Sequence, residues 1–225
     1  MEAVRAALDS GAMRAGVKYS VYQLSEALGV SRTPVRDALL RLEEVGLIRF
    51  EARQGFRILL PDAREIADIF AVRLALEVPA AARAAAVCDA ALAARLHDRL
   101  AAMDAAAAAG DERDFVAHDQ LLHDHILEAS GNMRARAIVR SLRESTRLLG
   151  ATTADRSRTL GDIDAEHVPV VAAIVAGDAP SAAAAMRRHL TSTGRLLVAQ
   201  AVRDQDSGLD GAAVWAAAVR VEQVE

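Results

Sequence analysis

Long alanine-rich runs with apolar residues at helical spacing fill the sequence after Leu60, and strand-like alternation is absent from that region. The chain of 225 residues is 52% hydrophobic but only 3% aromatic. Alanine and leucine favour helices, and small side chains let helices approach closely. The pattern predicts a mainly α protein whose larger part is an antiparallel helical bundle.

The first sixty residues follow a different pattern. Apolar spacing predicts a helix near the N-terminus, a second helix opened by a capping box at Ser20–Gln23, and a third that begins near Ser31. After Gly46 the period changes to alternation, which predicts a small β-hairpin within residues 47–60. Three helices and a hairpin, with a short turn before the third helix, predict a winged helix-turn-helix domain over residues 1–60.

Charge is unevenly distributed between these two regions. Residues 1–60 contain nine basic and seven acidic side chains, a net charge of +2, whereas the rest contains eighteen and twenty-four, a net charge of −6. Six arginines lie between Ser31 and Arg57: Arg32, Arg36, Arg41, Arg49, Arg53 and Arg57. A basic cluster beside an acidic body is typical of a phosphate-facing module. The alternative is that these arginines only keep a small helical domain soluble.

The third helix would enter the major groove with its N-terminal side chains nearest the bases. Ser31 and Thr33 suit hydrogen bonds to phosphates or base edges, and Arg32 and Arg36 are long enough to bind guanine bidentately. At the tip of the wing, residues 53–55 (Arg53, Gln54 and Gly55) are placed to meet the neighbouring groove. The sequence thus predicts double-stranded DNA as a partner.

A resemblance adds to this interpretation. Residues 24–39, which contain VSRTPVRDAL, together with Arg41–Glu43 and Gly46–Ile48, closely resemble the winged helix-turn-helix signature of the GntR family. The resemblance implies that Arg32 and Arg36 are the main DNA contacts, with assistance from Ser31, Thr33 and Pro34, and that Gly55 lies at the wing tip. Many relatives carry a DNA-contacting arginine near the start of the second helix, where this chain has Tyr22. The sequence leaves the operator preference at that contact open.

The helical region is predicted to start almost without a linker. Pro61 closes the wing, Asp62–Glu65 forms a capping box, and Pro79 is expected to kink the helix that follows. Further helices are predicted at residues 90–109, 113–129, 133–149, 162–176 and 180–203. Residues 61–203 are therefore predicted to form an effector and dimerisation domain. The tail, residues 204–225, is either a loose helix or disordered.

Four polar residues lie on apolar, inward faces of these helices. Asp119 and His123 are four residues apart on one helix, while His167 and His189 each share an apolar stripe on a later helix. A buried carboxylate is costly unless it is paired, and a divalent cation would satisfy all four side chains. The alternative is that the histidines are hydrogen-bonded core residues and that Asp119 pairs with an arginine. His97, His118 and His125 fall on other faces, where we expect solvent.

This region is similar to the FCD effector domain of the FadR-like branch of GntR regulators. The resemblance runs from about Arg64 to Leu197, and its motifs are D-x-x-x-H at 119–123, E-A-S-G-N at 128–132, the segment that follows His167, and M-R-R-H-L at 186–190. It implies that Asp119, His123, His167 and His189 hold a divalent metal, with zinc favoured and nickel or manganese as alternatives. The branch of the family that binds acyl-CoA lacks the complete set of four metal ligands, whereas this chain has all four. Arg73 and Glu77 match the branch's R-x-x-x-E, and Arg73 either binds an effector carboxylate or is locked by Glu77 or another nearby acid.

These observations predict a homodimeric transcriptional regulator that reads a palindromic operator and responds to a small carboxylate bound at the metal. Two rivals stay open: a metal-dependent hydrolase using the Asp/His set, and a helical protein-interaction module. The single cysteine, Cys88, fits a reducing cytosol. Charged residues interrupt every apolar run and the N-terminus lacks a signal-peptide core, so we expect a cytoplasmic protein without a membrane span.

Overall fold

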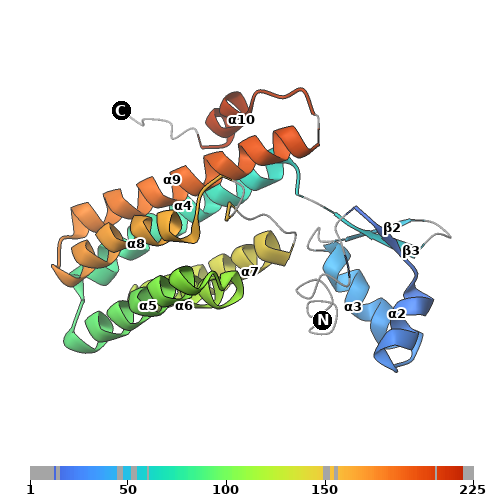
Figure 1. The fold of residues 1–225 in the computed structure, drawn as a ribbon, viewed down its shortest axis with the longest axis horizontal. Helices are drawn as coiled ribbons and strands as arrows, with labels where there is room; N and C mark the ends of the chain where they lie inside the picture. The colour runs from blue at the N-terminus through green and yellow to red at the C-terminus, as the bar shows by residue number, and fades with distance from the viewer. Residues whose placement is uncertain are drawn as a thin grey trace. The chain divides into compact units, whose positions relative to one another are not determined.

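The computed structural model of the chain divides into two compact units (Figure 1). The first comprises residues 1–61 and 144–151, and the second comprises residues 62–143 and 152–225. The structure describes residues 13, 16–44, 48–51, 55–59, 61–148, 153–154, 157–205 and 207–219. The helix predicted near the N-terminus lies outside these residues.

The N-terminal unit combines a helix-turn-helix with a small antiparallel sheet. Its elements are β1 (Lys18–Tyr19), α2 (Val21–Leu28), α3 (Arg32–Glu44), β2 (Ile48–Glu51) and β3 (Gly55–Ile58). The sheet order is β1-β3-β2, with Tyr19 opposite Phe56 and Phe50 opposite Phe56 on the other side. The predicted hairpin is present, and β1 extends it. A two-residue strand is too short to show alternation in a sequence, so this third strand was missed.

The apolar residues that gave the helical spacing and the strand alternation in the sequence form the core of this unit. Its buried apolar residues are Met13, Leu24, Val35, Leu39, Leu42, Ile48, Phe56 and Ile58. The Ser20 side chain accepts a hydrogen bond from the Tyr22 backbone and caps α2. At the start of β3, Gly55 has φ +94°, and a Cβ there would lie 2.1 Å from the Tyr19 carbonyl oxygen. Only glycine allows β1 to approach β3 this closely.

The second unit is built from helices. They are α4 (Ala63–Ala86), α5 (Ala90–Ala109), α6 (Glu112–Ala129), α7 (Met133–Leu148), α8 (Leu160–Val175), α9 (Ala179–Asp204) and α10 (Gly211–Ala218). Residues 133–143 of α7 belong to this unit, and the end of the helix belongs to the first. Asp62 caps α4 by accepting two backbone hydrogen bonds, and Pro79 lies inside this helix, which continues to Ala86. Helix α4 packs along α9, α5 packs on α6, and α8 contacts α5 and α9 (Figure 1). The predicted mainly α fold with an N-terminal helix-turn-helix is confirmed.

The tail forms helix α10, which packs on α4 and α9. Its tryptophan, Trp215, is buried beside Phe70, with 6.3 Å between ring centroids. Gly194 on α9 makes room for the indole, because a Cβ at that position would lie 2.3 Å from the Trp215 ring. The tail helix is therefore packed rather than loose. Among the described residues, no helix combines the length and hydropathy needed to cross a bilayer.

Candidate metal centre and DNA-binding face

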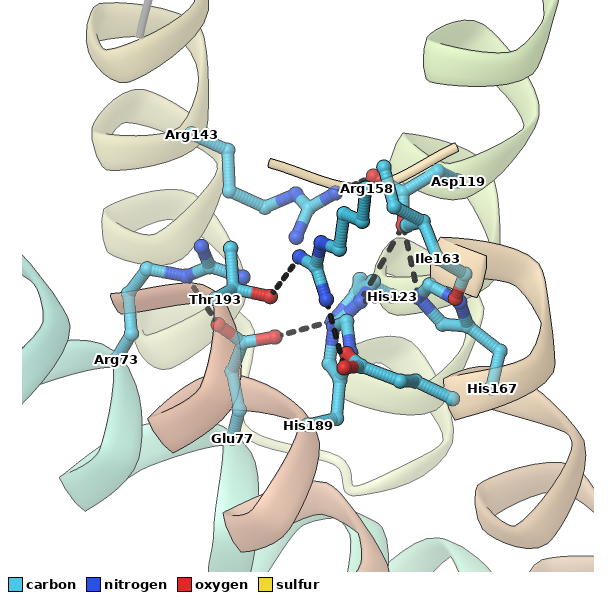
Figure 2. A network of polar contacts seen from close by, with 11 residues as sticks. Arg73, Glu77, Asp119, His123, Arg143, Arg158, Ile163, His167, His189 and Thr193 are labelled. Carbon is cyan, nitrogen blue, oxygen red and sulfur yellow. Dashed lines mark hydrogen bonds and ion pairs between the residues drawn. The ribbon is translucent and has the colours of Figure 1, made fainter. Parts of the chain in front are cut away.

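Three buried histidines converge from three helices. His123 on α6, His167 on α8 and His189 on α9 are 1%, 0% and 6% exposed, and each offers a ring nitrogen within 4.8 Å of the other two (Figure 2). The Nε2 atoms of His123 and His167 are 3.4 Å apart. The apolar stripes that predicted these three inward positions thus bring the imidazoles to one point.

The outer nitrogen of each imidazole contacts an oxygen acceptor. Nδ1 of His123 lies 2.5 Å from Glu77 Oε2, Nδ1 of His167 lies 2.9 Å from the Ile163 carbonyl oxygen, and Nδ1 of His189 lies 2.9 Å from Glu166 Oε2. An acceptor at this position favours the tautomer in which Nδ1 carries the proton and donates it. In that tautomer the Nε2 lone pair is free to bind a metal.

The Asp119 carboxylate lies beside two of the three histidines, His123 and His167. Its Oδ1 lies 2.9 Å from His167 Nε2 and 3.6 Å from His123 Nε2, while Oδ2 accepts a hydrogen bond from Arg143. Burial opposes ionisation of Asp119, but Arg143 and the histidines hold its pKa well below the ordinary value. The sequence left open whether Asp119 faces the histidines or pairs with an arginine. In the structure it does both.

The charge state of this cluster fits a cation. Burial is the main cause that lowers the pKa of His123 to about 4 and that of His189 to about 3, so both imidazoles are neutral at neutral pH. In the tautomers set by the outer acceptors, imidazole lone pairs and an ionised carboxylate oxygen face one another. Acceptor atoms at 2.9–3.6 Å repel unless a proton or a cation lies among them. The donor set, three nitrogens and one oxygen, suits a divalent transition metal.

Arg73 and Glu77 on α4 form one wall of the site. The Arg73 Nε donates to Glu77 Oε1 at 2.7 Å, and the other Glu77 oxygen accepts from His123. Arg73 Nη2 is buried and has no hydrogen-bond partner, and neither has the Nε of Arg143. Arg73 is therefore locked by Glu77, as one alternative had it, yet it keeps a donor for a further group.

The site contains three side chains that sequence reasoning did not assign to it. Arg143 holds Asp119, Glu166 holds His189, and Arg158 Nη1 lies 2.6 Å from Glu166 Oε1. Arg158 also donates to the Thr193 hydroxyl (Figure 2). The only sequence signal for Glu166 was its position next to His167, and Arg143 and Arg158 gave none.

The expectation that the other three histidines are solvated was right only in part. His97 is exposed. His118 is half-buried, near Arg99 and Asp114, and His125 is half-buried too. The apolar pattern of the sequence did not predict that His118 and His125 are half-buried. None of the three belongs to the cluster that the described residues form.

Most of the predicted DNA contacts lie at the start of α3, on its exposed side. Ser31, Arg32, Thr33, Pro34 and Arg36 are all exposed, while Val35 and Leu39 face the core. The Arg32 guanidinium lies over the Tyr22 ring and that of Arg36 lies over the Phe50 ring. Arg53 lies outside the described residues. Gly55 has the structural role given above, whatever its part in contacting DNA.

A helix-turn-helix with exposed arginines, in one chain with a helical domain that encloses a polar site, defines a DNA-binding transcriptional regulator with an effector domain. The family described as bacterial regulatory proteins, gntR family, matches residues 1–58, and the FCD domain family matches residues 68–192. The chain belongs to the GntR family of transcriptional regulators and carries an FCD domain. These families are regulators rather than enzymes, which decides against the hydrolase alternative.

Individual relatives agree with this assignment. The chain is 33% identical over 128 residues to an HTH-type transcriptional regulator from the TAR-I ttuE-ttuC' intergenic region of Agrobacterium vitis, covering 56% of this chain and 75% of the relative. It is 26% identical over 207 residues to the HTH-type transcriptional regulator LutR of Bacillus subtilis, covering 82% and 93%. The solved structure of McbR/YncC from E. coli has a TM-score of 0.74 at 24% identity, covering 88% of this chain and 95% of that one, and shows a shared fold.

Proposed function

We propose that this regulator holds one divalent metal ion at Asp119, His123, His167 and His189, and that a small carboxylate bound there controls operator binding. The observation that carries this proposal is a set of distances: the Nε2 atoms of His123 and His167 and the Asp119 Oδ1 lie 2.9–3.6 Å from one another, and His189 completes the buried histidine cluster. Zinc suits the ligands best, and nickel or manganese would also fit them. The bound metal would supply a Lewis-acidic centre that attracts an anionic ligand.

The residues beside the cluster support a carboxylate rather than a neutral effector. The Nη2 of Arg73 and the Nε of Arg143 are buried donors without acceptors. An unsatisfied buried donor of this kind costs about 1–3 kcal/mol, and a carboxylate oxygen would remove that cost. Glu77 fixes Arg73 from the other side, so its free N–H is already oriented. A neutral ligand would gain less from both arginines.

On the DNA side, we propose that Arg32 and Arg36 contact bases, that Ser31, Thr33 and Pro34 assist them, and that Arg53 and Gly55 act at the wing tip. A homodimer would place two such helices in successive major grooves of a palindromic operator. The effector would act by changing the spacing of the two helices, because a small rotation misaligns the half-sites.

Metal content and ligand binding test this proposal together. We expect about one divalent metal per chain in the wild type and in His97→Ala, which removes an exposed histidine, and little in His167→Ala. Calorimetry with a panel of small organic acids should detect binding to the metal-loaded protein, weaker binding to Arg73→Ala, and none after chelation. The same acid should shift operator binding in a gel-shift assay.

Two results would contradict the proposal. The first is substoichiometric metal in the wild type together with no rise in melting temperature on adding Zn²⁺, Ni²⁺ or Mn²⁺. The second is equal binding of an uncharged ligand or an acyl thioester to the chelated protein, which would make any metal structural.

A further inference from the structure

Both candidate base-reading arginines rest on aromatic rings. The Cζ of Arg32 lies 4.8 Å from the centroid of the Tyr22 ring on α2, and that of Arg36 lies 5.7 Å from the Phe50 ring on β2. Both distances fall within the roughly 6 Å at which a guanidinium is attracted to an aromatic face. Each of these two arginines on α3 therefore contacts an aromatic ring from a different element, α2 or β2.

The two rings differ in what else they do. Phe50 is half-buried and packs on the core of the N-terminal unit, where its ring contacts Phe56. Tyr22 is 48% exposed and is absent from that core. Its hydroxyl donates to Glu26 Oε1 at 2.5 Å, one helical turn further along α2. The hydroxyl of Tyr22 therefore makes a local contact within α2, and the core of the unit does not include its ring.

We propose that Tyr22 is a positioning residue for operator recognition, whose ring orients the Arg32 guanidinium and thereby sets the base preference at that contact. This inference rests on the proposed role of Arg32. The N–H groups of a guanidinium lie in its plane, so a ring against one face leaves the edges free to bind guanine O6 and N7. Holding the side chain before DNA binds reduces the rotamer freedom that binding must remove.

The neutral ring also has an electrostatic consequence. Tyr22 contributes no positive charge to a phosphate, and its hydroxyl donates to Glu26 rather than outward, so we expect its effect to act through Arg32. Removing the ring should weaken binding most on the preferred base pair and little on duplexes that Arg32 reads poorly. A residue that contacts phosphate directly would instead change affinity for all sequences alike.

A double-mutant cycle with the full chain tests this role. Selection from a randomised duplex library with the wild-type protein gives a consensus duplex, and comparison with Arg32→Ala identifies the base pair that Arg32 reads. Fluorescence anisotropy then measures Kd for the wild type, Tyr22→Leu, Tyr22→Phe, Arg32→Ala and the Tyr22→Leu/Arg32→Ala double variant. The probes are the consensus duplex and the three duplexes altered at that base pair.

The expected results separate the ring from the hydroxyl. Tyr22→Leu should weaken consensus binding by about 3- to 10-fold, the range for losing the pre-orientation of one long side chain. It should change binding to the altered duplexes, or in the Arg32→Ala background, by less than about twofold. Tyr22→Phe keeps the ring and should stay within about twofold of the wild type. Because Tyr22 is exposed, all variants should keep the wild-type melting temperature.

Each contrary outcome has a distinct meaning. If Arg32→Ala leaves affinity and base preference unchanged, or if no sequence is enriched, the proposed role of Arg32 fails and the role of Tyr22 fails with it. If Arg32→Ala has its expected effect but Tyr22→Leu weakens all duplexes equally, with or without Arg32, Tyr22 does not position Arg32. A uniform loss in Tyr22→Phe would show a direct contact from the hydroxyl and would also overturn the inference.

Discussion

The two candidate sites of this protein differ in how their residues are exposed and connected. At the start of α3 the predicted DNA contacts lie within two helical turns and are exposed, and two of them, Arg32 and Arg36, lie over aromatic rings of neighbouring elements. In the helical unit the polar groups come from α4, α6, α8 and α9 and are buried against one another. We therefore expect substitutions in the exposed site to alter DNA binding without altering the free energy of unfolding. Substitutions in the buried site should alter both ligand binding and the free energy of unfolding.

The largest expected effect follows from removing one member of the buried network. Glu77 is 1% exposed and accepts hydrogen bonds from Arg73 and His123, so Glu77→Ala leaves a buried charge and a buried donor unpaired. We expect a loss of about 3–5 kcal/mol in the free energy of unfolding. Urea denaturation of the chelated protein measures it, which keeps metal binding out of the comparison.

Glu128→Ala is the matched control on the surface. This carboxylate pairs with Arg95 and Arg136 but is 37% exposed, so its loss should cost less than about 1 kcal/mol. If the two substitutions cost the same, the buried network gives the helical unit no special stability, and the contrast between the two sites disappears.

A smaller effect is expected on the exposed site, and in binding rather than folding. Arg36→Ala should cost about 1–3 kcal/mol of operator affinity and relax base preference. Its free energy of unfolding should stay within about 0.5 kcal/mol of the wild type. Footprinting and anisotropy report the first quantity, and urea denaturation reports the second.

Arg41→Ala is the control for charge alone. Arg41 is an exposed arginine in the last turn of the same helix, away from the N-terminal turns that approach base edges. Its removal should lower affinity evenly across sequences, if at all. A loss of base preference equal to that of Arg36→Ala would mean that position along α3 does not decide which arginine reads bases.

The same contrast explains what the sequence could and could not predict. The DNA-binding motif is contiguous, so VSRTPVRDAL and the change of period after Gly46 were enough to predict the winged domain. The three histidines could be predicted because each interrupts an apolar stripe on its own helix. Two groups that position the cluster could not be predicted. Arg143 contacts Asp119, and Glu166 contacts His189, through the packing of separate helices. Local periodicity carries no information about which helices become neighbours.

The smallest quantity that separates the two sites is the coupling between paired substitutions. Arg73→Met and Glu77→Leu each leave a buried partner unsatisfied, whereas the double variant removes the ion pair and replaces it with apolar volume. We expect the double variant to be less unstable than the sum of the single variants by about 0.5–3 kcal/mol. On α3, Arg32 and Arg36 rest on different rings, so the stability effects of Arg32→Ala and Arg36→Ala should add to within about 0.5 kcal/mol. Urea denaturation of both cycles gives the comparison. Equal coupling in the two pairs would show that burial is not what links residues in this protein, because the exposed arginines on α3 have the same four-residue spacing as the buried pair on α4.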